Sequence, residues 1–265
     1  MWILQLNGSE PAATLALSRG LAALIIAGTA CVLLYYLYRF GSDVLAVRRT
    51  RRKLWYFALG TGAAVIYGAC RLLALYTEWA WPAVMAEGAT LFFILFFALG
   101  FRAVYLSMPE TGRWVSETGR GDPFRRYLPT WLDYLIIGGY IVAWWSGFLL
   151  AHRVTDFVLA IGWLLASGWA LIWALLIVRR HEGTSIAALT RHLFPAVAAF
   201  AGIVVADVVT SLMAAENVGT AMWIVGTVLV GAFFLTTAIA LRQESGEVER
   251  IYDHTTYRGR GRESE

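Results

Sequence analysis

The sequence predicts an all-α integral membrane protein, a bundle of seven transmembrane helices with the N-terminus outside and the C-terminus in the cytoplasm. Three observations predict this fold class. Of the 265 residues, 59% are hydrophobic and only 15% are charged, whereas soluble domains carry about 25% charged residues. The apolar residues form seven continuous stretches, each long enough to cross a bilayer. The basic residues gather after alternate stretches, as they do in cytoplasmic loops.

The composition also limits the classes of function. A water-soluble protein needs a polar surface, so this chain is not expected to be a soluble enzyme or a nucleic-acid-binding protein, despite its net charge of +4. The only two cysteines, Cys31 and Cys70, argue against a disulfide scaffold. The expected partner that follows directly is membrane lipid.

The seven expected spans are helices because their apolar runs are continuous and do not alternate with a period of two. They cover residues 12–40, 54–76, 81–106, 131–151, 157–178, 193–215 and 221–241. We expect residues 1–241 to form the transmembrane domain. Residues 242–265 are polar and carry both charge signs, which predicts a disordered cytoplasmic tail.

The basic residues predict the orientation in the cell membrane. All but three of the 22 lysine and arginine residues follow the first, third, fifth or seventh span. An odd number of spans puts these four segments on one side, which is expected to be the cytoplasmic side. The segments contain Arg39, Arg48, Arg49, Arg51, Arg52 and Lys53; then Arg102, Arg113, Arg120, Arg125 and Arg126; then Arg179, Arg180 and Arg191; and finally Arg242, Arg250, Arg258, Arg260 and Arg262.

Small residues repeat at steps of four in several spans. Membrane helices associate through close backbone contact at such residues. The spacing predicts helix contacts at Gly60, Ala64 and Gly68, at Gly139, Ala143 and Gly147, and at Gly162 and Ala166.

Three ionisable residues inside the spans define the candidate site. Charged side chains in hydrocarbon are costly and are functional candidates for that reason. Arg71, Glu87 and Asp207 are each expected about 7–12 Å below the outer surface, counting 1.5 Å per residue from the span ends. One guanidinium can serve two carboxylates, and the remaining negative charge would then be balanced by a proton, a cation or a polar ligand. The residues expected to line this site are Tyr67, Trp145, Ser146, Trp163, Thr210 and Ser211.

Two other interpretations of these charges stay open. They could form a purely structural ion pair with one acid protonated, or Arg71 could extend to the outer interface and leave the acids unpaired. Arg102 is interpreted as an ordinary charge at a span end. Pro195 is expected in the first turn of the sixth span, where proline is tolerated.

The sequence predicts no catalytic residue, no metal ligand and no cofactor. The four histidines lie at span ends, in loops or in the tail, and do not form the intramembrane pair that haem would need. No cysteine and histidine spacing indicates a zinc site.

The seven-span plan resembles the topology of the microbial opsins, and Tyr76-Thr77-Glu78-Trp79 is similar to the Tyr-x-Asp-Trp of the third opsin helix. That resemblance would imply a retinal Schiff base on a lysine of the seventh helix. The only lysine is Lys53, which precedes the second span, so a covalent retinal pigment is excluded. No family is assigned.

Three functions remain as hypotheses. The first is a non-enzymatic sensor or receptor-like bundle with an outward-facing polar site and a protein partner at the arginine-rich cytoplasmic loops. The second is a small transporter or proton or cation pathway that uses Glu87 and Asp207. The third is a structural or assembly subunit whose basic loops contact anionic lipid or another protein.

Overall fold

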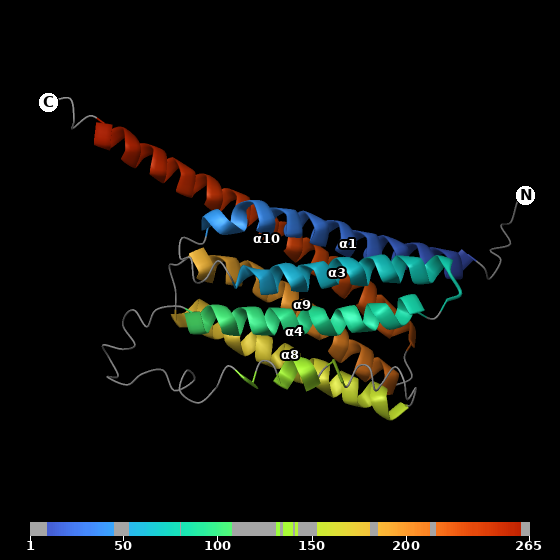
Figure 1. Cartoon of the computed structure of the whole chain (residues 1–265). Helices are drawn as coiled ribbons and strands as arrows, with labels where there is room; N and C mark the ends of the chain where they lie inside the picture. Colours follow the sequence, from blue (N-terminus) through green and yellow to red (C-terminus); the bar gives the residue numbers. More distant parts are fainter. Residues whose placement is uncertain are drawn as a thin grey trace, which may run out of the picture.

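The computed structural model describes residues 10–44, 53–79, 81–107, 131–132, 135–139, 141–142, 153–180, 185–212 and 216–260 (Figure 1). Within this part of the chain the secondary structure is α-helical. The six long helices are α1 (Glu10–Val44), α3 (Leu54–Tyr76), α4 (Trp81–Ser107), α8 (Arg153–Arg180), α9 (Ser185–Leu212) and α10 (Glu216–Arg260).

All six long helices are long and apolar enough to cross a bilayer. The chain is therefore a multi-pass helical membrane protein, which confirms the predicted class. The predicted fourth span, 131–151, lies mostly outside the described residues, which include only short helical stretches of it at 131–132, 135–139 and 141–142.

The helices pack in the order α1, α3, α4, α8, α9 and α10, and α10 returns to pack on α1. Small residues make two of these contacts, as the sequence predicts. A Cβ atom on Gly60 of α3 would lie 2.6 Å from the ring of Phe97 on α4. A Cβ atom on Gly68 would lie 2.7 Å from the carbonyl oxygen of Ala23 on α1. In the predicted series of the fourth span, Gly139 is exposed, and Ala143 and Gly147 lie outside the described residues.

The centre of the bundle is filled by phenylalanine rings. Phe93 of α4 is fully buried, and its ring centroid lies 4.5 Å from that of Phe200 on α9 and 5.9 Å from that of Phe234 on α10. Further along α4, Phe97 and Phe101 pack on Phe57 of α3. We call these six residues the phenylalanine column. The column joins four helices, α3, α4, α9 and α10.

Side-chain contacts also define the relative directions of two helix pairs. Arg19 of α1 bonds Thr220 of α10, and Gly231 of α10 packs on Ile25 further along α1, so these two helices run parallel. The rings of Tyr105 on α4 and Trp173 on α8 lie 5.1 Å apart, so α4 and α8 end at the same end of the bundle.

Basic residues of five of the six long helices, and Lys53 directly before α3, lie near one end of the bundle, which we call the basic end. The described basic residues near it are Arg39, Lys53, Arg102, Arg179, Arg180, Arg191 and Arg242. The opposite end contains the start of α1, the connection between α3 and α4, and the start of α10 (Figure 1).

Helix α10 differs from the sequence expectation because it continues to Arg260, through residues for which the sequence predicts a disordered tail. Residues 242–250 are rich in Glu, Gln and Arg, which are good helix formers. Extending an existing helix also avoids the nucleation step that an isolated polar segment would have to make. Figure 1 shows this part of α10 projecting beyond the bundle.

Helix α9 begins at Ser185, eight residues before the predicted span, so Pro195 lies inside the helix and the prediction of a first-turn position is wrong. Proline cannot donate the usual hydrogen bond to the carbonyl four residues earlier. Membrane helices tolerate this change because neighbouring helices shield and re-satisfy the freed group.

Candidate functional site

A cation held by two aromatic rings lies between α3 and α10. Tyr67 and Arg71 are four residues apart on α3 and so share one helix face. The guanidinium carbon of Arg71 lies 5.5 Å from the ring centroid of Tyr67 and 5.7 Å from that of Trp223 on α10. Both distances are within the range of cation–π attraction, about 6 Å.

A hydrogen bond locks the two rings in place. The indole Nε1 of Trp223 donates to the hydroxyl oxygen of Tyr67 at 2.6 Å. Tyr67 is buried, and its ring also packs edge-on against Phe200 of α9. The rings that face Arg71 are therefore held by three helices, α3, α9 and α10.

Arg71 keeps hydrogen-bonding capacity to spare. Its Nε is shielded from solvent and makes no hydrogen bond with the described part of the chain. A guanidinium has five N–H donors, and the ring faces satisfy its charge without accepting those hydrogens in the usual geometry. A buried donor without an acceptor is unfavourable by about 1–3 kcal/mol, which favours an added acceptor such as an anion or water.

A second arginine lies at the same end of the bundle. Arg19 of α1 donates from Nη2 to Oγ1 of Thr220 at 2.7 Å. Thr220 precedes Trp223 by three residues, so both lie on one face of α10. We call the set Arg19, Tyr67, Arg71, Thr220 and Trp223 the aromatic–arginine site. Its described side chains carry two positive charges and no negative charge.

Small residues make room for these large side chains. Ala22 and Ala23 of α1 are buried at the depth of the site, next to the close contact at Gly68. Thr210 of α9 packs on Gly219, where a Cβ atom would lie 2.6 Å from its Oγ1. The Thr210 hydroxyl donates to the carbonyl of Ala206 at 2.7 Å, so this predicted lining residue serves helix packing.

Glu87, predicted to pair with Arg71, belongs to α4. In the α3–α4 pair, Gly60 opposes Phe97 and Gly100 opposes Phe57, so Arg71 is level with the turn that contains Glu87. The Glu87 side chain is exposed, whereas the neighbouring Ala86 is fully buried.

The other predicted site residues are spread over the chain. Asp207 and Ser211 belong to α9, and their side chains lie outside the described residues, as do Trp145 and Ser146 entirely. Trp163 is half-buried on α8, which packs on α4 and α9. The structure thus brings Arg71 and Tyr67 together, and the Arg71–Glu87–Asp207 cluster stays a prediction.

Sequence reasoning missed Trp223, Thr220 and the role of Arg19. The last predicted span has no ionisable residue, so nothing marked Trp223 as part of a polar site. The available signal was the three-residue spacing of Thr220 and Trp223, which places a hydroxyl and an indole N–H on one face.

A second polar cluster lies at the basic end. Arg102 of α4 is 0% exposed, so the prediction of an ordinary boundary charge is wrong for this residue. It lies one turn from Tyr105, whose hydroxyl accepts a hydrogen bond from Arg180 of α8.

Within the described ranges, no group of three or more His, Cys, Asp or Glu residues could hold a metal ion. Cys31 is exposed, Cys70 is buried, and both are free thiols.

Comparisons with protein-family models, with curated proteins and with solved structures find no match to the chain.

Proposed function

We propose that this chain is a non-enzymatic, seven-helix sensor or receptor-like protein of the cell membrane. A ligand at the aromatic–arginine site would change the position of α10. One observation carries the proposal. Helix α10 contributes Thr220 and Trp223 to the site and then continues without interruption to Arg260. Its 45 residues correspond to about 68 Å at 1.5 Å per residue, more than twice the ~30 Å of bilayer hydrocarbon. A conformational change at the site can therefore be transmitted along this one helix to the other side of the membrane.

The helix directions support a seventh crossing. Because α4 and α8 run parallel, the chain leaves α4 at the basic end and enters α8 at the opposite end. Residues 108–152 connect these two ends and include the apolar stretch 131–151. The parallel course of α1 and α10 likewise agrees with an odd number of crossings.

The positive-inside rule then orients the bundle. Basic residues of five of the long helices, together with Lys53 before α3, lie near one end, which is therefore assigned to the cytoplasm. The aromatic–arginine site faces outward in this orientation, and the end of α10 lies inside, where a protein partner could bind it.

The chemistry of the described side chains favours a small anion as the ligand. Two arginines with spare N–H donors suit a carboxylate or phosphate group, and aromatic faces keep the guanidinium of Arg71 oriented. A proton or cation ligand would instead need the side chains of Glu87 and Asp207 beside Arg71.

The transport alternative receives less support from the packing. The phenylalanine column occupies the centre of the described bundle, with Phe93, Phe97, Phe200 and Phe234 each at most 1% exposed. A pathway through the centre would have to displace these rings, whereas a signal along α10 would not.

The proposal is tested by measuring whether the site controls the cytoplasmic end of α10. In a Cys31→Ser, Cys70→Ala background, nitroxides on Arg179→Cys and Ser245→Cys report the distance between the end of α8 and the part of α10 at the basic end by double electron–electron resonance. Arg71→Leu removes the cation held by Trp223 and is expected to shift the mean distance by about 1–2 Å, as in interface helix shifts. Val225→Leu, on an exposed position of α10, is the matched control. Identical distance distributions in Arg71→Leu and in the control would contradict the proposal.

A further inference from the structure

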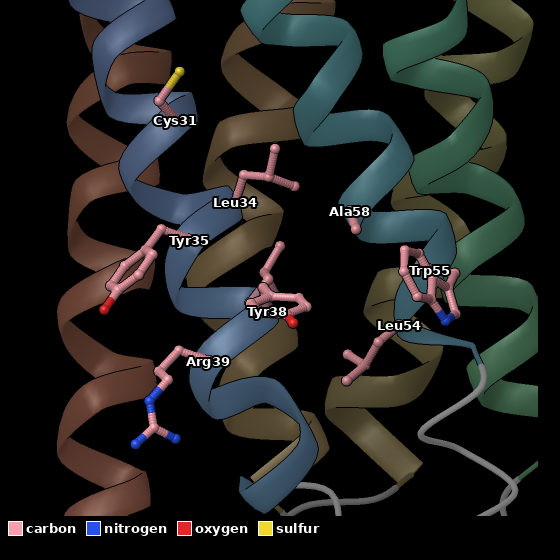
Figure 2. Close-up of a pocket in the computed structure, with 9 residues that line it drawn as sticks. Cys31, Leu34, Tyr35, Tyr38, Arg39, Leu54, Trp55 and Ala58 are labelled. Carbon is pink, nitrogen blue, oxygen red and sulfur yellow. The ribbon is translucent and has the colours of Figure 1, made fainter.

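A groove runs along the outside of α1, α3 and α4 from the basic end past the middle of the bundle. It consists of two hollows, one of about 840 Å³ between α1 and α3 (Figure 2) and one of about 590 Å³ that continues over α3 and α4. Leu34, Trp55 and Ala58 line both hollows, so the two form one continuous groove.

The lining of the groove changes from polar to apolar along its length. Its basic end has the charged side chain of Arg39 and the hydroxyl groups of Tyr35 and Tyr38. Figure 2 shows Tyr38 between α1 and α3, with Arg39 beside it on the flank of α1 that faces α10. The described residues that line the part over α3 and α4 are apolar, namely Leu34, Trp55, Ala58, Leu59, Gly62, Ala63, Ile66, Met85, Gly88, Ala89, Phe92 and Phe96.

The apolar part begins at Trp55, near the start of α3, and reaches Met85 on α4. Because Gly60 opposes Phe97 and Gly100 opposes Phe57, Met85 lies level with Leu72 of α3. The slot therefore extends about 25 Å along the bundle at 1.5 Å per residue. Half of the hydrocarbon thickness is about 15 Å, so an acyl chain that enters from the basic end has room along the whole of its leaflet. The slot is open at its floor, because a Cβ atom on Gly62 would have no atom within 4 Å.

The described charge at the polar mouth is the guanidinium of Arg39. The sequence between α1 and α3 contains five further basic residues, Arg48, Arg49, Arg51, Arg52 and Lys53. Basic clusters at a membrane surface attract anionic lipid, with about 1 kcal/mol for each Lys or Arg near the surface. An occupant of the groove is thus expected to be anionic at one end and apolar along the rest.

We propose that this groove binds one anionic glycerophospholipid from the leaflet at the basic end. The lipid phosphate lies near Arg39 and the Tyr38 hydroxyl, Trp55 marks the level of the interface, and one acyl chain fills the slot over Gly62. A free phosphate ion would leave the slot unused, and an apolar transmembrane helix would leave the charges at the mouth unused. The site does not depend on the function proposed for α10.

The proposal is tested by native mass spectrometry of the purified full chain, titrated with dioleoyl-phosphatidylglycerol and, separately, with dioleoyl-phosphatidylcholine. The first bound phosphatidylglycerol is expected to have a Kd lower than phosphatidylcholine by roughly fivefold or more, from the charge at the mouth. Equal Kd values for the two lipids in the wild-type protein would overturn the proposal, whatever the behaviour of variants.

Two pairs of variants locate the site. Gly62→Leu fills the slot and is expected to weaken both lipids, whereas Gly202→Leu on α9, also open beyond 4 Å, leaves both unchanged. Arg39→Gln is expected to remove most of the preference for phosphatidylglycerol, and Arg179→Gln, an exposed arginine at the same end, to preserve it. Unchanged phosphatidylglycerol binding in Gly62→Leu would overturn the site. Displacement of the lipid by inorganic phosphate alone would also overturn the proposal and assign the site to a free anion. A dimer that dissociates in Gly62→Leu, with lipid binding unchanged, would overturn it too and assign the groove to a second copy of the chain.

Discussion

Arg71 illustrates how a single charge can be kept inside an apolar bundle. A guanidinium in hydrocarbon is costly when it has no partner. Here Tyr67 and Trp223 present their ring faces to it, and their mutual hydrogen bond of 2.6 Å keeps both rings in position. The charge is thereby stabilised by neutral side chains, and the guanidinium N–H groups remain available to an acceptor.

We predict that Tyr67 and Trp223 stabilise the bundle cooperatively. Trp223→Phe removes the indole donor and Tyr67→Phe removes its acceptor, so each single variant loses the same hydrogen bond. In a double-mutant cycle of unfolding free energies in mixed micelles, the coupling is expected to be about 0.5–1.5 kcal/mol. Additive effects of the two substitutions would show that the bond does not contribute to stability.

At the residue scale, the sequence identifies the charge but not the groups around it. Arg71 stands out because an arginine in an apolar span is conspicuous. Trp223 does not, because its contribution depends on which faces of α3 and α10 meet. Glu87 illustrates the same difficulty, since counting residues gives its depth, whereas its exposed side chain depends on the rotation of α4.

At the scale of the element, small residues decide how closely the helices approach. Gly68 of α3 lies directly on the backbone of α1, whereas Gly62 on the same helix faces open space. This difference is invisible in the sequence, where both are glycines of one apolar span. It follows from the position of each residue around the helix axis.

We predict opposite effects for alanine at these two glycines. Gly68→Ala would force α1 and α3 apart and is expected to destabilise the bundle by about 1–3 kcal/mol, the usual range for overpacking. Gly62→Ala is expected to be neutral or stabilising by up to about 1 kcal/mol, because alanine favours the helix. Thermal unfolding in detergent checks both, and a similar loss of Tm in the two variants would argue against the close contact at Gly68.

Sequence patterns locate the helices well but their ends poorly. The first three predicted spans agree with α1, α3 and α4 to within a few residues. The apolar length of a segment reflects the thickness of the bilayer, whereas helical hydrogen bonding can continue into the polar residues on either side of that segment. For that reason α9 begins at Ser185 and α10 extends to Arg260, both beyond the apolar stretches.

At the scale of the whole molecule, the distribution of charge and the packing of helices agree. The sequence predicts that basic residues collect on one side, and the contacts of Arg19, Tyr105 and Gly231 independently define helix directions that bring them to one end. The sequence predicts alternating helix directions only on the assumption that 131–151 crosses the membrane, whereas the contacts of the described helices give the directions without that assumption. The fold class was predictable because apolar length and charge asymmetry are local properties of the chain.

The central claim is that the connection between α3 and α4 and the extension of α10 lie on opposite sides of the membrane. The most direct measurement labels single cysteines with a membrane-impermeant maleimide in intact cells and after permeabilisation. In a Cys31→Ser, Cys70→Ala background, we expect Glu78→Cys to be labelled in intact cells. Arg242→Cys is expected to be labelled only after permeabilisation. Labelling of both positions from the same side would mean an even number of crossings and would contradict the proposed path of the signal along α10.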